Sequence, residues 1–194
     1  MGTIRQTSIR NTNVVSEYAM VKRWIAQGLF WPTYAWNLTW GRLFKVRRWW
    51  DVVDEVVVLG ARPLRRDVKT FHETLHITGV INMCEEYCGP TDLYEQFGIE
   101  QLWLPTVDFT PPNLGDVERG VEFIEQHAQK NGRVYVHCKA GRARSATVVL
   151  CWLVKYRGMT PQEAQEHLLK VRPHVHSKLP ERAVVQEFVR LLGK

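Results

Sequence analysis

The chain has 194 residues, of which 45% are hydrophobic and 24% are charged. These values fit one soluble α/β domain with a sizeable core and exclude a low-complexity chain. Four cysteines are too few for a disulfide scaffold of this length, so we expect a reducing compartment in which any special cysteine is reactive.

The formal net charge of +6 is concentrated in the first fifty residues. They hold eight Lys and Arg against one acid, Glu17, and six of the eight tryptophans, whereas the other 144 residues carry a net charge of −1. Basic residues mixed with Trp and Tyr are typical of a segment at a membrane interface. Stacking on nucleic acid and packing in the core are the alternatives.

Two stretches of this segment bear on its location. The uncharged run over residues 24–41 is long enough to span a bilayer, but it contains Gln27, Pro32 and Asn37, which favours an interfacial segment. Residues 1–16 contain Arg, Ser and Thr but no acid, as a short mitochondrial presequence would. We therefore divide the chain into a basic, Trp-rich N-terminal extension, residues 1–50, and a folded domain, residues 51–194.

Strands and helices are predicted to alternate after residue 50. The predicted strands cover 55–60, 80–83, 100–105 and 133–137. The predicted helices cover 65–79, a segment after the loop 110–116, 143–158, 161 to about 172, and 181–193. This alternation predicts an α/β fold with a central, mainly parallel sheet and helices on both faces. Sites in such sheets lie beyond the carboxyl ends of the strands, and Cys138 directly follows the strand 133–137.

The segment after this strand combines a cysteine with several cations and leads into a helix. Backbone N–H groups at a helix N-terminus attract anions and lower a thiol pKa, so Cys138 is expected to be a nucleophilic thiolate. The Arg144 guanidinium can bind two oxygens of a phosphoryl group, and Gly141 permits a backbone turn. The Ser145 hydroxyl can hydrogen-bond the thiolate.

The string His-Cys-x-x-Gly-x-x-Arg-Ser over residues 137–145 is similar to the signature of the cysteine-based protein tyrosine phosphatases. The cysteine would attack phosphorus in line and form a phosphocysteine, which water then hydrolyses. The expected substrate-binding residues of this segment are His137, Lys139, Ala140, Gly141, Arg142, Ala143 and Ser145. His137 is expected to orient the loop through its ring nitrogens. We expect no metal and no other cofactor; His174 and His176 are expected to be solvated.

The leaving alkoxide needs a proton donor, and Asp108 is the candidate. It follows the predicted strand 100–105 and is the only acid between Glu100 and Asp116. In this superfamily the general acid is an aspartate on a movable loop about thirty residues before the cysteine. The same carboxylate would activate water in the second step. A role as a turn or cap residue is the alternative.

Further strings resemble the mitochondrial dual-specificity-type phosphatases that act on phosphatidylglycerophosphate. They are LFWPTYAWN (29–37), RRWWDVVDEVVVLGARPL (47–64), GVINMCEEY (79–87), VDFT (107–110) and VYVHCKAGRARSAT (134–147). The resemblance runs from about residue 28 to the C-terminus. It implies that Cys138 is the nucleophile, Arg144 the phosphate-binding arginine and Asp108 the general acid.

The same resemblance matches Glu85 and Glu86 to an acidic pair beside the cysteine loop, where a carboxylate could brace Arg144 or Arg142. Solvated acids at a helix start are the alternative. Cys84 and Cys88 stand where an asparagine and an acid were expected, which leaves the shape of the substrate rim open.

The favoured function is conversion of phosphatidylglycerophosphate to phosphatidylglycerol, a step of phospholipid and cardiolipin biosynthesis. Lys139 and Arg142 suit such an anionic lipid. A dual-specificity protein phosphatase, a phosphoinositide phosphatase and a non-catalytic phospho-binding protein are the alternatives. The intact Cys138, Arg144 and Asp108 argue against the last of these.

We expect a monomer that binds no nucleic acid and lies on the matrix side of the mitochondrial inner membrane, held there by its N-terminal segment. The cytoplasmic face of a bacterial membrane is the alternative location.

Cys84 is a candidate for a redox role, because it ends a predicted strand at the same edge of the sheet as Cys138. A reversible disulfide between them would protect the thiolate, if the two Cβ atoms approach closely enough. A buried unpaired thiol is the alternative.

Overall fold

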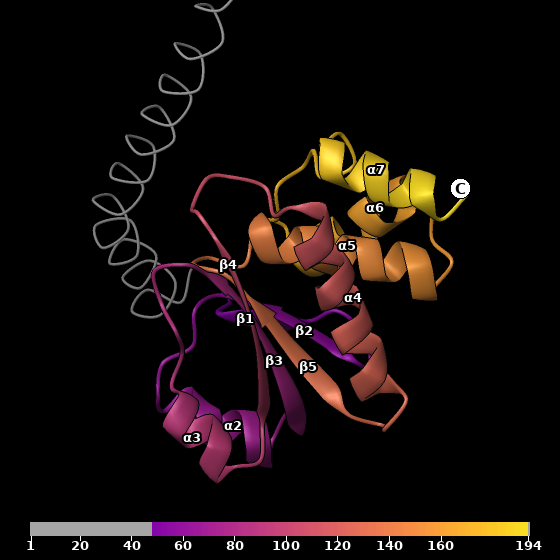
Figure 1. Ribbon diagram of the computed structural model, residues 1–194. Coiled ribbons are helices and arrows are strands. Elements are labelled where there is room, and N and C mark those ends of the chain that lie inside the picture. The colour runs from indigo at the N-terminus through magenta and orange to yellow at the C-terminus, as the bar shows by residue number, and fades with distance from the viewer. Residues whose placement is uncertain (1–47, 194) are drawn as a thin grey trace, which may run out of the picture.

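A five-stranded sheet lies at the centre of the computed structural model, which describes residues 48–193 (Figure 1). The strands are β1 (Trp50–Val52), β2 (Val57–Gly60), β3 (Ile77–Cys84), β4 (Glu100–Thr106) and β5 (Arg133–His137). Their order across the sheet is β1-β2-β5-β3-β4, and only the β1–β2 pair is antiparallel. The predicted mainly parallel sheet is therefore confirmed, with β5 in its middle.

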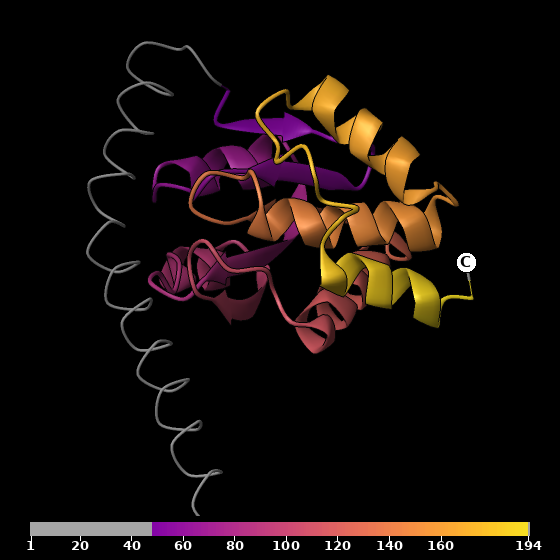
Figure 2. The ribbon, with the colours of Figure 1, turned by 90° about the horizontal axis from the view of Figure 1, so that it is seen from above.

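Helices cover both faces of this sheet, as predicted (Figures 1 and 2). They are α2 (Asp67–Glu73), α3 (Thr91–Gln96), α4 (Leu114–Ala128), α5 (Arg144–Tyr156), α6 (Pro161–Val171) and α7 (Ala183–Leu191). Along β5, Val134 and Val136 join the core beneath α4–α7, whereas Tyr135 joins the smaller core beneath α2 and α3. This alternation arises because successive side chains of a strand point to opposite faces.

Helix α5 lies between α6 on one side and α4 and α7 on the other (Figure 2). Its residues from Arg144 to Val154 are all buried, which explains why its sequence is apolar nearly all round. A capping box starts α6: the Thr160 backbone N–H donates to the Glu163 carboxylate, 2.8 Å, and the Glu163 N–H donates to the Thr160 hydroxyl, 3.2 Å.

The prediction of one helix over 65–79 followed by a short strand was wrong. Helix α2 ends at Glu73, and His76 adopts a left-handed backbone conformation with φ of 53°. The chain then enters β3 at Ile77, three residues before the predicted strand. Ile77 and Thr78 are β-branched and pair better with a neighbouring strand than they extend a helix, so tertiary pairing with β5 sets this boundary.

Two short elements were not predicted, β1 and α3. Strand β1 has three residues and α3 has six, too few to produce a periodic pattern. The predicted strand 133–137 coincides with β5, and the remaining predicted elements overlap the observed ones but differ at their ends.

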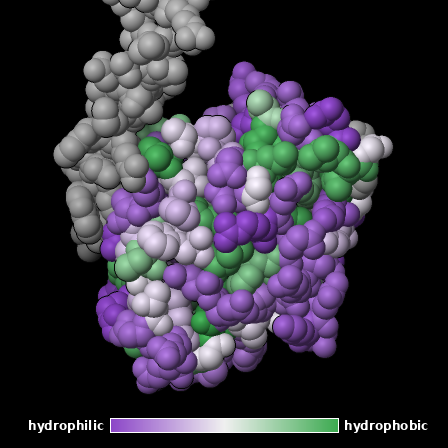
Figure 3. Space-filling view, viewed as in Figure 1, coloured by the Kyte–Doolittle hydropathy of each residue, from purple (hydrophilic) through white to green (hydrophobic). Residues whose placement is uncertain are grey.

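The N-terminal extension and its expected membrane role lie outside the described residues, apart from residues 48–50. Within residues 48–193, no helix combines the length and the apolar character needed to cross a bilayer. Polar residues cover most of the face seen in Figure 3, and apolar residues form smaller patches between them.

Candidate active site

The site forms where β5 passes into α5, at the middle of the sheet. Residues 138–143, here called the cysteine loop, connect the two elements. Gly141 has φ of +64°, and a Cβ atom there would collide with the carbonyl of Gly60. Both observations require glycine at this position, so the turn predicted for Gly141 follows from backbone sterics.

The backbone carbonyls of residues 139–143 of the cysteine loop accept hydrogen bonds from outside the loop. The Lys139 carbonyl accepts from the Arg62 N–H, 3.3 Å, and the Arg142 carbonyl accepts from the His176 N–H, 2.9 Å. The Ala143 carbonyl accepts from the Thr147 N–H of α5, 3.0 Å. Because these carbonyls are satisfied, the loop can present its N–H groups to an anion.

Arg172 supplies the bonds to the two carbonyls between these. Its Nε donates to the Gly141 carbonyl, 2.9 Å, and its Nη2 to the Ala140 carbonyl, 3.0 Å. The side chain is fully buried, and its Nη1 pairs with the Asp51 carboxylate of β1, 2.6 Å. A buried ion pair on β1 therefore fixes the shape of the cysteine loop.

Cys138 lies at the base of the site with 4% of its surface exposed. Burial opposes ionisation of its thiol, but several groups favour the thiolate: the Arg144 charge, the Ser145 hydroxyl 3.3 Å away, and the backbone of Ser145 and Arg142. Together they lower the thiol pKa to about 7. A substantial fraction of Cys138 is therefore a thiolate at neutral pH.

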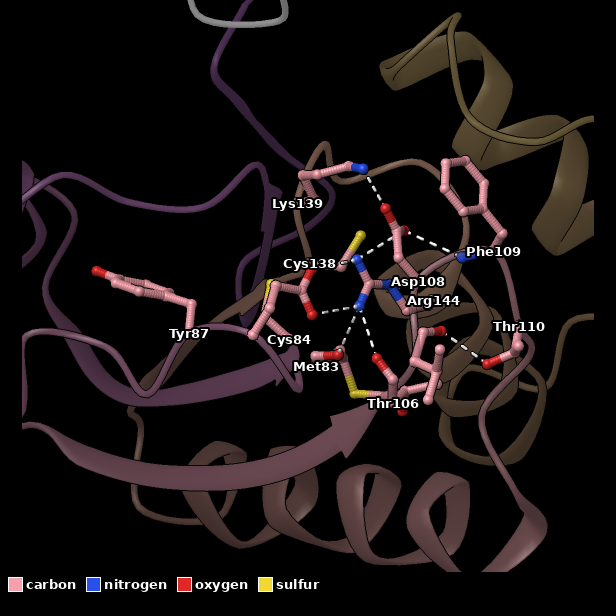
Figure 4. A network of polar contacts seen from close by, with 12 residues as sticks. Met83, Cys84, Tyr87, Thr106, Asp108, Phe109, Thr110, Cys138, Lys139 and Arg144 are labelled. Carbon is pink, nitrogen blue, oxygen red and sulfur yellow. Dashed lines mark hydrogen bonds and ion pairs between the residues drawn. The ribbon is translucent and has the colours of Figure 1, made fainter. Parts of the chain in front are cut away.

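The Arg144 guanidinium reaches the cysteine loop from the first turn of α5 (Figure 4). Its Nη1 donates to the carbonyls of Met83, 3.2 Å, and Thr106, 2.7 Å, at the ends of β3 and β4. Its Nη2 pairs with the Glu86 carboxylate, 3.2 Å. The bracing contact expected of the acidic pair is thus present for Glu86, and it holds the guanidinium beside Cys138.

Asp108 lies in the loop after β4 and contacts the same guanidinium. Its Oδ1 accepts from Arg144 Nη2, 2.8 Å, and its Oδ2 accepts from Lys139 Nζ (Figure 4). The carboxylate therefore neutralises two cations of the site. The next residue, Phe109, is 72% exposed and adopts a left-handed backbone conformation with φ of 65°. The centroid of its ring lies 4.8 Å from Lys139 Nζ.

His137 is buried between aromatic rings, with centroids 5.8 Å from Tyr135 and 6.3 Å from Tyr87. Burial lowers its pKa to about 3, so the ring is neutral. Among the described residues its ring nitrogens make no hydrogen bond of normal geometry, so its expected role in orienting the loop stays a prediction.

The other predicted residues divide by burial. Lys139 is buried, Ala140 and Ala143 are partly buried, and Arg142 is exposed with its Nε donating to the His174 carbonyl, 2.7 Å. Glu85 is partly exposed.

A cavity of about 490 Å³ opens above Cys138. Residues of the Asp108 loop form one wall, and His176 and Arg182 form part of another. Sequence reasoning missed Arg182 entirely and treated His176 as a solvated loop residue. Both follow α6 in the chain, and only the fold brings them to the cysteine loop.

All four cysteines are free thiols, and Cys84 and Cys138 are both buried. Burial raises the pKa of Cys84 well above its usual range, and a negative charge on Cys138 raises it further. Cys84 is therefore a neutral thiol within electrostatic range of the thiolate. The reversible disulfide between them stays a prediction.

The family assignment follows from the residues that the family model matches. The model for the dual specificity phosphatase catalytic domain matches residues 58–188. The chain belongs to the dual-specificity phosphatase family. The cysteine loop, Arg144 and Asp108 all lie inside the matched range, and the chain is a phosphatase, a phosphoric monoester hydrolase.

The similar curated proteins indicate which members of the dual-specificity phosphatase family this chain resembles. The chain is 42% identical over 166 residues to a protein from Arabidopsis thaliana named phosphatidylglycerophosphate phosphatase PTPMT2, covering 84% of this chain and 72% of the relative. It is 36% identical over 178 residues to the Homo sapiens phosphatidylglycerophosphatase and protein-tyrosine phosphatase 1, covering 88% and 89%. The chain therefore belongs to the same subfamily as these phosphatidylglycerophosphate phosphatases.

Solved structures agree with this placement. The crystal structure of PTPMT1 in complex with PI(5)P matches with a TM-score of 0.68 and 35% identity, covering 75% of this chain and 97% of that one. Human DUSP28, at 21% identity and a TM-score of 0.62, shares the fold.

Proposed function

We propose that this phosphatase hydrolyses the terminal phosphomonoester of phosphatidylglycerophosphate and releases phosphatidylglycerol. The observation that carries the proposal is the assembled group of Cys138, Arg144 and Asp108 at the base of a cavity whose walls are cationic. A cavity of about 490 Å³ falls in the range of sites that take a whole headgroup rather than a bare phosphate. The relatives named above for this substrate support the choice of lipid.

The first step is attack by the Cys138 thiolate on phosphorus. The S–P bond forms as the P–O bond to the glycerol oxygen breaks. Arg144 and the N–H groups of the cysteine loop bind the three non-bridging oxygens, whose charge must be stabilised throughout the transfer. Glu86 and the carbonyls at the ends of β3 and β4 hold Arg144 in place for this task.

Asp108 donates the proton that the leaving glycerol oxygen needs. Its carboxylate pairs with Arg144 and Lys139. An arriving phosphate dianion competes with Asp108 for both cations, which leaves its carboxyl group available to the leaving oxygen. In the second step the ionised Asp108 takes a proton from water, whose oxygen attacks the phosphocysteine and frees the thiolate.

The proposal is tested by phosphate release from matched substrates. Phosphatidylglycerophosphate, a phosphoinositide monophosphate and a phosphotyrosine peptide are compared at equal concentration, with release in the absence of enzyme as background. We expect kcat/KM for phosphatidylglycerophosphate to exceed that for the peptide by at least about tenfold, since the cationic walls meet a more anionic substrate. Equal or faster turnover of the peptide would sink the lipid assignment.

Asp108→Asn in the same assay tests the general acid. Turnover of the lipid, whose alkoxide leaves poorly, should fall roughly 10²- to 10⁴-fold. Turnover of para-nitrophenyl phosphate should fall far less, because its phenolate leaves without a proton. Equal losses on the two substrates would show that Asp108 acts on binding or on loop shape instead.

A phosphoinositide is the second candidate substrate. It is favoured by the similarity to PTPMT1, whose structure was solved in complex with PI(5)P. The substrate comparison above distinguishes the two lipids directly.

We further propose that the part of the N-terminal extension before the folded domain holds the enzyme on an anionic bilayer, in mitochondria at the matrix face of the inner membrane. The support is its basic, Trp-rich composition. Deleting residues 1–45 should weaken binding to anionic vesicles at least about tenfold in a sedimentation assay, while binding to neutral vesicles changes little. Unchanged binding to anionic vesicles would reject this role.

A further inference from the structure

The cavity above Cys138 holds two arginines that the phosphoryl chemistry does not use. Arg142 lies in the cysteine loop and Arg182 at the start of α7, and both line the cavity. The carboxylates nearby are committed elsewhere: Asp108 and Glu86 pair with Arg144 and Lys139. Within residues 48–193, no ion pair involves Arg142 or Arg182.

Arg182 is held as part of the cavity wall. Its Nη1 donates to the Thr147 hydroxyl on the first turns of α5, 3.0 Å. The segment that carries it is tied to the cysteine loop by the bond from the His176 N–H to the Arg142 carbonyl, 2.9 Å. Buried Val175 and Leu179 anchor the same segment in the core. The guanidinium is therefore prepositioned rather than free in solvent.

The charges of these groups act on one another across the cavity. Burial lowers the pKa of His176, and Arg182 and Arg142 lower it further. Burial lowers the pKa of Arg182, while the charge of Cys138 raises it. A half-buried guanidinium that donates to a neutral hydroxyl and has no carboxylate partner is only partly compensated for its lost hydration, and a bound anion would supply the rest.

We propose that Arg182 and Arg142 form a second anion subsite that binds the phosphodiester of a glycerophospholipid headgroup. The cysteine loop and Arg144 take the terminal phosphomonoester, and the diester lies one polyol unit away in the same cavity. This inference rests on the proposed lipid substrate and names Arg182 as a specificity-determining residue. Phosphatidic acid and phosphopeptides lack a phosphodiester at this spacing and would leave the subsite empty.

The test measures a ratio of specificity constants. For Arg182→Gln, kcat/KM is measured with dispersed short-chain phosphatidylglycerophosphate and with para-nitrophenyl phosphate, which has no diester. Loss of a charged hydrogen-bonded contact predicts that the ratio falls roughly 10- to 100-fold. Any effect of Arg182 on the Cys138 thiolate lowers both constants alike and leaves the ratio unchanged. Arg142→Gln, at an exposed position, should also lower the ratio.

Arg66→Gln is the matched control. Arg66 is exposed beside α2 on the opposite face of the sheet, and its loss changes the net charge by the same amount. The ratio of this variant should equal that of the wild type.

Three results would overturn the subsite. The first is an unchanged ratio in Arg182→Gln, and the second is an equal fall of the ratio in Arg66→Gln. The third is a fall of the ratio that is seen with lipid in anionic vesicles but not with dispersed lipid, which would mean that Arg182 only attracts the enzyme to the membrane surface. If the wild-type enzyme hydrolyses a phosphoinositide and not phosphatidylglycerophosphate, the proposed substrate is wrong. The ratio is then measured with the phosphoinositide, which also carries a phosphodiester, so the two failures are distinguishable.

Discussion

Replacing Cys138 by serine should abolish phosphate release while the protein stays folded and still binds its substrate. A serine hydroxyl is not ionised at neutral pH, so the group that attacks phosphorus is lost. Arg144 and the loop N–H groups remain and continue to bind the phosphoryl oxygens. We expect kcat to fall at least about 10⁴-fold. Phosphate release measures the first effect, and binding of the dispersed lipid measures the second.

Cys88→Ser is the control for loss of a thiol, because Cys88 is exposed and lies outside the cavity. Its activity should match that of the wild type. Residual turnover above about 1% in Cys138→Ser, once background is subtracted, would show that another group can attack phosphorus. An equal loss of activity in Cys138→Ser and Cys88→Ser would show that Cys138 is not specifically required as the nucleophile.

Much of this site could be predicted because its chemistry is local in the sequence. The cysteine loop spans a few residues, and the strand before it and the helix after it are both strongly patterned. Their order alone places Cys138 at a helix N-terminus and at the edge of the sheet. Arg144 and Ser145 follow at fixed spacing, so their positions depend on few tertiary contacts.

The parts that could not be predicted depend on contacts between distant segments. Arg172 bonds to carbonyls 31 and 32 residues away and to Asp51, 121 residues away. In the sequence it is merely the basic residue before a proline. Arg182 becomes part of the cavity wall only because α7 packs against α5. Helix α2 ended early for the same kind of reason, since pairing of β3 with β5 outweighed local helix propensity.

Arg172→Met should destabilise the protein and disturb the cysteine loop together. The substitution removes the buried partner of the Asp51 carboxylate, which keeps only the exposed Arg48 at 3.4 Å, and it removes both donors to the Ala140 and Gly141 carbonyls. Breaking a buried pair in this way costs about 3–5 kcal/mol of the free energy of unfolding. The freed carbonyls allow the loop N–H groups to turn from Cys138, which should raise its pKa. Urea unfolding measures the first effect, and the pH profile of kcat/KM measures the second.

The pH profile of kcat/KM distinguishes a role of Arg172 in positioning the cysteine loop from a role in stabilising the fold alone. The thiolate is the reactive form, so kcat/KM of the wild type should fall about tenfold per pH unit below its thiol pKa of about 7. A raised pKa in Arg172→Met moves this limb to higher pH. The double variant Arg172→Met, Asp51→Leu removes both charges and should recover much of the lost stability, because no unpaired ion stays buried. Its acidic limb should remain displaced, since neither side chain can bond the loop carbonyls. If the limb returns to its wild-type position along with the stability, Arg172 supports the fold and does not position the loop.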